Sequence, residues 1–125
     1  MKKIVCIILV VIICIAISCS GWGKNKWERQ VYNIAEEAIE VFDFYYFDKQ
    51  ISAKKAAIKL EDYKEQIDEI INETTYDMEL VNRIQLTSIS STVLCLEVAV
   101  RFDNPDKLEM RNELAKLVGK KQKIN

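Results

Sequence analysis

The side chains in this sequence that could carry out acid–base chemistry or hold a metal ion are its carboxylates. Glu36 and Glu40 are four residues apart, as are Glu65 and Glu69, so each pair shares one face of a predicted helix. The paired carboxylates of glycoside hydrolysis flank the scissile bond, whereas one helix face presents both groups side by side. Di-metal helical bundles use Glu-x-x-His motifs, and this sequence has no histidine. We therefore expect these carboxylates to form a solvated surface.

No other arrangement of residues favours catalysis. The sequence has no Gly-x-Ser-x-Gly motif, no phosphate-binding glycine loop and no Cys–His pair for nucleophilic attack. We therefore expect no enzymatic activity, no cofactor and no metal site. Basic and acidic residues are mixed, with a formal net charge of −1, whereas nucleic-acid binding needs a clustered basic face. The sequence thus argues against a nucleic-acid partner.

The most unusual composition lies between residues 42 and 48, which include five of the chain's aromatic residues. Because successive residues of a helix are 100° apart, five neighbouring rings cannot all face one core. Some of them are expected at the surface, where acidic side chains would rim a contact patch for a protein or a sugar-like ligand. Alternatively, the rings close the end of a small bundle. The candidate binding residues are Asp43, Phe44, Tyr45, Tyr46, Phe47, Asp48 and Phe102, with Asp103 completing the rim.

A second candidate surface is the hydroxyl-rich run from Thr87 to Thr92. These side chains could line a polar groove, but the favoured interpretation is that they let two helices approach closely while bonding to their own backbone. Cys95 follows this run and is the only cysteine after residue 19. We expect Cys95 to be a small buried hydrophobic residue, with an intermolecular disulfide as the alternative.

The beginning of the chain has the pattern of an export signal. Lys2 and Lys3 precede fourteen apolar residues, Ile4 to Ile17, which are followed by Ser18 and Cys19. A basic start, a short apolar run and small residues at the end are typical of a signal peptide. Fourteen residues of helix span about 21 Å, which is short of the roughly 30 Å hydrocarbon core of a bilayer.

The residues Ala16-Ile17-Ser18-Cys19 resemble the lipobox of bacterial lipoproteins. This resemblance implies cleavage before Cys19 and a lipid on that cysteine. Two alternatives remain open: the apolar segment stays as an uncleaved anchor, or an ordinary cleavage after Ser18 releases the domain. All three place the domain outside the cytoplasmic membrane, because Lys2 and Lys3 hold the N-terminus on the cytoplasmic side. The expected location is the outer face of the cell membrane, with a lipid anchor.

The expected organisation is a signal peptide over residues 1–18, a lipidated cysteine and linker over 19–26, a helical domain over 27–119 and a basic tail over 120–125. Near the membrane, indole and basic side chains suit the headgroup zone. Four residues form this membrane-proximal group: Trp22, Lys24, Lys26 and Trp27. For Trp27, the beginning of the core is an equally acceptable role.

Apolar spacings of three and four residues predict helices over about Lys26–Phe47, from Ser52 as an N-cap, over about Tyr76–Arg101, and from Pro105 to a cap at Gly119. Residues 92–102 also alternate as a strand would, but an isolated strand has no partner here. Short turns force neighbouring helices antiparallel. We predict an all-α fold, a small antiparallel bundle of three long helices and a shorter fourth, whose first and third turns meet at the end away from the membrane.

These observations lead to a functional hypothesis. The chain is expected to be a membrane-tethered, extracytoplasmic helical interaction module that binds a protein or envelope component through its aromatic end. The alternative is a small protective lipoprotein of the immunity or exclusion kind, for which the membrane-proximal residues would matter. A hydrolase that uses carboxylates alone is a weaker third possibility.

Overall fold

The computed structural model describes residues 26–74 and 79–124 of the chain. The predicted signal peptide, Cys19, Trp22 and Lys24 lie outside the described residues, whereas Lys26 and Trp27 begin the first described helix. The chain divides into two compact units, residues 1–30 and 31–125. The architecture below is that of the second unit.

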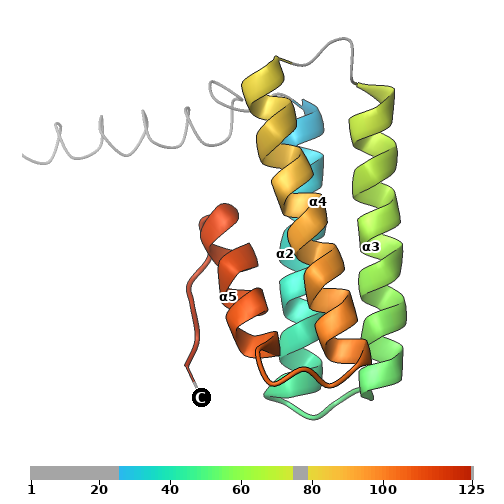
Figure 1. The fold of residues 1–125 in the computed structure, drawn as a ribbon, viewed down its shortest axis with the longest axis vertical. Helices are drawn as coiled ribbons and strands as arrows, with labels where there is room; N and C mark the ends of the chain where they lie inside the picture. Colours follow the sequence, from blue (N-terminus) through green and yellow to red (C-terminus); the bar gives the residue numbers. More distant parts are fainter. Residues whose placement is uncertain (1–25, 75–78, 125) are drawn as a thin grey trace, which may run out of the picture. The chain divides into compact units, whose positions relative to one another are not determined.

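Four helices make up the described chain: α2 (Lys26–Tyr46), α3 (Ala53–Glu73), α4 (Leu80–Arg101) and α5 (Lys107–Leu117). Consecutive helices run in opposite directions, and the α2–α3 and α4–α5 turns lie at the same end (Figure 1). The all-α prediction of three long helices and a shorter fourth is confirmed, as is helix for residues 92–101. The alternation that suggested a strand arises because α4 is apolar on two opposite sides.

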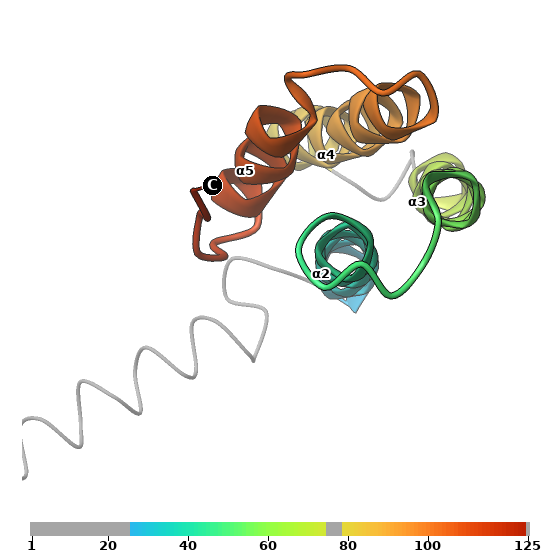
Figure 2. The ribbon, with the colours of Figure 1, turned by 90° about the horizontal axis from the view of Figure 1, so that it is seen from below.

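The core lies among the four helices. In the end view of Figure 2, α4 lies between α3 and α5, and α2 is on the side opposite α4. Each helix contributes fully buried apolar side chains, and the largest are Phe42, Leu60, Ile67, Leu86, Ile89, Leu96 and Leu114. Burying a side chain of this size contributes about 1.5–3 kcal/mol. Buried alanines complete the core, including Ala35, Ala38, Ala56, Ala57 and Ala115.

Polar contacts fix α3 against α4. Asp68 of α3 accepts hydrogen bonds from Lys64 on its own helix, as the i, i+4 spacing predicts, and from Ser90 of α4. Burial acts to raise the pKa of Asp68, but these two hydrogen bonds lower it below the usual value. Further along, Arg101 donates to Glu97 at 2.6 Å and to Glu61 of α3 at 3.0 Å. These contacts set the register between the two helices.

The turn between α2 and α3 follows the sequence prediction closely. Lys49 adopts a positive φ of 57°, and the Gln50 N–H closes the turn on the Phe44 carbonyl at 2.8 Å. Ser52 is the N-cap of α3, because its side chain accepts from the Lys55 N–H at 3.1 Å. The predicted cap is confirmed.

The start of α5 differs from the prediction, which placed Pro105 at its first position. The helix begins at Lys107, and Pro105 belongs to the preceding turn. Asn104 is the reason: its side chain accepts from the Asp106 N–H at 2.8 Å, and its carbonyl accepts from the Lys107 N–H at 3.2 Å. The fixed φ of proline suits the second position of such a turn.

The end of α5 follows the prediction. Gly119 has a φ of 73° and donates to the Lys116 carbonyl, while Lys120 donates to the Ala115 carbonyl at 2.7 Å. This is the Schellman arrangement, in which a left-handed glycine ends a helix. The chain then reverses and runs back along α5 (Figure 1).

The N-cap of α3 leads to a stability prediction. We expect Ser52→Ala to lower the free energy of unfolding by about 1 kcal/mol, because the Lys55 N–H loses its acceptor. Urea denaturation followed by circular dichroism measures this change. Ser52→Asp is the matched control, since aspartate also caps helices and should retain most of the stability. Equal losses in both variants would contradict the capping role.

Candidate functional site

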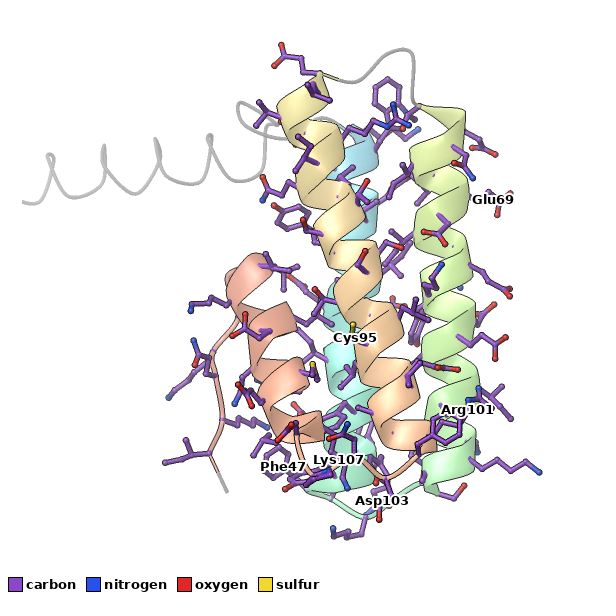
Figure 3. All side chains as sticks on the ribbon, viewed as in Figure 1. Phe47, Glu69, Cys95, Arg101, Asp103 and Lys107 are labelled. Carbon is purple, nitrogen blue, oxygen red and sulfur yellow. The ribbon has the colours of Figure 1, made fainter. Side chains whose placement is uncertain are left out.

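The predicted aromatic site lies at the end of the bundle where the α2–α3 and α4–α5 turns meet, as Phe47, Asp103 and Lys107 show in Figure 3. Phe42 is fully buried, and Tyr45 and Tyr46 pack partly buried against the core. The Phe42 and Tyr46 rings stack with centroids 5.2 Å apart, and Phe47 meets Tyr46 edge to face at 4.9 Å. These rings therefore close the end of the bundle.

Lysines cover the rings of this end. The Lys49 and Lys107 ammonium groups lie 5.4 and 5.9 Å from the Tyr46 ring centroid, and that of Lys123 lies 4.9 Å from the Phe47 centroid. At these distances a cation is attracted by the negative face of the ring. The hydrogen bond to Asp103 raises the pKa of Lys107, which keeps its ammonium group charged.

Of the three aspartates expected to rim the rings, Asp43 departs from the prediction. Asp43 turns toward α5, where its two oxygens each accept from Arg111 at 3.0 Å, from Nε and from Nη2. Asp103 is exposed and pairs with Lys107 at 2.5 Å. Asp48 is also exposed, and of these three aspartates it alone has no ion pair with the described residues. The orientation of Asp43 could not be predicted, because its partner Arg111 comes from α5, 68 residues further along the chain.

The Arg111 side chain is the most buried charged group of the site. Arg111 is 3% exposed. In addition to its bonds to Asp43, it donates a hydrogen bond through Nη1 to the Lys121 carbonyl at 2.7 Å. Asn112 holds the next part of the tail, accepting from the Lys123 N–H and donating to the Lys123 carbonyl. The tail segment thus places Lys123 close to Asp43, at 3.2 Å. One arginine joins α2, α5 and the tail.

Only two of the predicted aromatic contacts are strongly exposed. Phe44 is 49% exposed beside a hollow between α2 and α3, whose lining includes Ile51 and Tyr63. Phe102 is 74% exposed and forms the C-cap of α4. The structure thus divides the predicted aromatic residues among packed rings, an α2–α3 surface and the end of α4.

The carboxylate pairs are distributed over the helix surfaces. Glu40, Glu65 and Glu69 are exposed, and Glu36 lies 3.7 Å from Lys120. Among the described residues, no group of three or more histidine, cysteine, aspartate or glutamate side chains is placed to hold a metal ion. In the membrane-proximal group, Lys26 is exposed and Trp27 is half-buried.

A separate apolar surface lies on α4. Its outward side, here called the outer face of α4, consists of exposed residues at spacings of three and four: Leu80, Ile84, Thr87, Ser91, Leu94, Val98 and Phe102. Leu80 is 70% exposed and Ile84 57%, and no charged residue occurs between positions 83 and 97. By length and composition α4 is apolar enough to cross a membrane, the one such helix in the described chain, although core helices also meet this criterion.

The burial predicted for Cys95 was wrong, and the outer face of α4 as a whole was not predicted from the sequence. Cys95, expected to be buried, is exposed beside this face (Figure 3). Two apolar stripes run along α4, and the inner one, through Leu86, Ile89, Val93 and Leu96, takes the core positions. The signal for the outer stripe was present in the 4-3-4-3-4 spacing from Leu80 to Val98, but it was masked by the strand-like alternation in the same residues.

Part of the hydroxyl run bonds to the backbone of its own helix, as the favoured interpretation expected. Ser88 donates to the Ile84 carbonyl at 3.0 Å, Thr92 donates to the Ser88 carbonyl at 2.7 Å, and Ser90 binds Asp68 of the neighbouring helix. Thr87 and Ser91 instead face outward. They help to line a shallow hollow of about 490 Å³ on α4 that also includes Leu80, Arg83 and Ile84.

Comparison with known proteins gives no relative to guide this assignment: no family model, curated protein or solved structure matches the chain.

The buried ion pair leads to a second stability prediction. We expect Asp43→Ala to lower the free energy of unfolding by about 3 kcal/mol, because Arg111 would keep its charge in a buried position without its carboxylate partner. Asp103→Asn is the control, since that aspartate is 84% exposed in its pair with Lys107 and asparagine tolerates its positive φ of 52°, so this change should cost much less stability. Urea denaturation at neutral pH compares the two.

A double variant tests the explanation itself. Asp43→Leu combined with Arg111→Met replaces both charges with apolar groups and should recover much of the stability lost in Asp43→Ala. A loss in Asp43→Ala no larger than that in Asp103→Asn would show that the pair is not a structural requirement.

Proposed function

We propose that this chain is a membrane-tethered, extracytoplasmic helical interaction module without catalytic activity, and that it contacts a protein partner through the outer face of α4. The observation that carries this proposal is the continuous exposure of apolar side chains along a helix that is packed on its other side. Leu94 and Val98 are 42% and 43% exposed, and Phe102 extends the stripe to the end of the helix.

Scattered apolar side chains are normal on protein surfaces, but a continuous stripe is typical of an interaction site. The comparison within this chain is Ile58 of α3, which is 53% exposed. Its neighbours one turn away include Lys54, Lys55 and Asp62, so it stands alone among charged groups. Ile84 on the outer face of α4 differs, because its neighbours one turn away, Leu80, Val81, Thr87 and Ser88, are all apolar or small.

The aromatic end is less suited to be the contact surface. Tyr45 and Tyr46 contribute to the core, and lysines already cover the faces of Tyr46 and Phe47. Of the residues first considered there, Phe102 belongs to the proposed surface, because it follows Val98 by one helical turn.

The tether rests on the sequence before residue 26. A lipid on Cys19 would hold the domain close to the membrane, because the linker from Ser20 to Lys26 spans at most about 25 Å. A tethered module needs less intrinsic affinity, since both partners are confined to one surface.

The contact surface can be tested with a photoreactive amino acid in the full chain, expressed in a bacterium. Placed at Ile84, the probe is expected to form covalent adducts severalfold more often than at Ile58, which has similar exposure. Gel analysis and mass spectrometry of the adducts provide the readout. Equal adduct yields at the two positions would contradict the proposed contact surface.

The tether is tested separately. We expect labelled palmitate to be incorporated into the unaltered chain and to be absent from Cys19→Ala, because the thiol that would carry the lipid is gone. Incorporation is measured on the immunoprecipitated protein. Label that persists in Cys19→Ala, or that is missing from the unaltered chain, would contradict lipidation at this residue.

A further inference from the structure

The outer face of α4 has the spacing of a helix–helix seam. From Leu80 through Ile84, Thr87, Ser91 and Leu94 to Val98 the intervals are 4, 3, 4, 3 and 4, which is the repeat that lets two helices pack along their length. All six residues are exposed. The seam therefore lacks its second helix within the described chain.

The order of residue types along this seam is the same when it is read from either end. Two branched apolar residues, Leu80 and Ile84, precede the hydroxyl residues Thr87 and Ser91, and two more apolar residues follow. If a second α4 is laid against the first in the opposite direction, centred between the hydroxyl residues, large residues meet large ones and small residues meet small ones. Leu80 then faces Val98 of the other copy, Ile84 faces Leu94, and Thr87 faces Ser91. A surface that is complementary to itself in this way is the requirement for a twofold-symmetric dimer.

The centre of the seam permits a close approach. Thr87 and Ser91 are small, and the hollow of about 490 Å³ lies around them. The hydroxyls of the flanking Ser88 and Thr92 are already bonded to carbonyls of their own helix, so a facing helix would not deprive them of a partner. Small residues at the point where two helices cross let their backbones come close together.

The charges at the edge of the seam favour the antiparallel direction. Arg83 is exposed and has no ion pair recorded among the described residues. In the antiparallel arrangement Arg83 lies at the level of position 95 of the other copy, about 18 Å along the seam from Arg83 of that copy and about 9 Å from its Arg101. A parallel arrangement would instead bring the two copies of Arg83 to the same level, and likewise the two copies of Arg101. Because like charges that face each other across an interface are unfavourable, these arginines favour the antiparallel direction.

We propose that the occupant of the outer face of α4 is a second copy of this chain, packed antiparallel with its twofold axis between Thr87 and Ser91. This inference rests on the proposed function and names the partner for the same surface. The seam from Leu80 to Val98 is about 27 Å long and about one helix wide, so the contact lies at the low end of specific interfaces, below about 1,200 Å² in total. The dimer is therefore reversible, and confinement to a membrane surface increases its population.

Disulfide cross-linking of the full chain in membranes tests both the contact and its direction. Two differently tagged chains are co-expressed in a Cys95→Ser background, one with Thr87→Cys and the other with Ser91→Cys. The antiparallel dimer predicts a disulfide between the two different chains, because these positions face each other. It predicts few disulfides between identical chains, whose added cysteines would be offset by about 6 Å along the helix as well as across it.

Controls separate this dimer from other contacts. The Cys95→Ser background without an added cysteine reports any link made by the cysteines at positions 6, 14 and 19. Cys95 itself should not form a disulfide in the unaltered chain, since the two copies would be about 18 Å apart along the antiparallel seam. Disulfides mainly between identical chains would overturn the antiparallel arrangement.

Two substitutions of opposite charge at facing positions provide a readout that loss of folding would not produce, because the second should restore what the first removes. Ile84→Glu should reduce the disulfide between the different chains by at least about tenfold, because a carboxylate is strongly disfavoured in an apolar seam. Adding Leu94→Lys to the same chains should restore much of it, since positions 84 and 94 face each other only in the antiparallel dimer. Failure of the second change to restore the disulfide, while circular dichroism shows both variants folded, would overturn the proposal.

The outcomes distinguish this inference from the proposed function. Photo-adducts at Ile84 to a different protein, with no disulfide between positions 87 and 91, would overturn the dimer and leave the interaction module intact. Absence of both adducts and disulfides would overturn both.

Discussion

The arrangement of the second half of the chain depends on the ion pair between Asp43 and Arg111. Arg111 is almost fully buried, and a guanidinium in that position needs a carboxylate in bidentate geometry to offset the loss of its hydration. The carboxylate comes from the last turn of α2, so α5 must lie against that end of the bundle. The Nη1 bond to the Lys121 carbonyl then holds the returning tail on the same side. A short helix with few core residues of its own is positioned in this way by one polar contact.

The placement of α5 has a consequence for α4. With 11 residues against 22, α5 is half as long as α4, and it packs beside α4 without covering its outward side (Figure 2). The inner stripe of α4 supplies the core, and the outer stripe stays in contact with solvent. A domain of about a hundred residues buries a modest core, so apolar side chains left in water forgo stabilisation that such a domain needs. An exposed apolar stripe is therefore typical of an interaction site. The two-sided helix thus makes the bundle both a folded unit and a potential interface.

The aromatic end of the bundle and the outer face of α4 differ in how well their apolar side chains are covered. At the turn end, the aromatic rings of α2 are close to lysines from three separate segments, namely Lys49, Lys107 and Lys123. Cations over ring faces cover apolar surface while remaining hydrated, which makes that end less adhesive than its composition suggests. Between Arg83 and Glu97, α4 has no charged residue of its own that could cover its outer face in this way. Composition alone pointed to the rings, whereas exposure points to the helix.

The sequence alone determined the helical fold, because apolar spacing, a serine cap and a glycine cap are local features whose geometry depends on a few neighbouring residues. Ser52 and Gly119 act as their residue types dictate. It did not determine where Asp43 points, that Pro105 precedes α5, or that Cys95 is exposed, since each depends on contacts between segments distant in the chain or on side chains of the turn. The two apolar stripes of α4 are equally visible in the sequence. Only the tertiary structure decided which one is buried, because a helix of this kind can present either side to the core and the positions of α2 and α3 select between them.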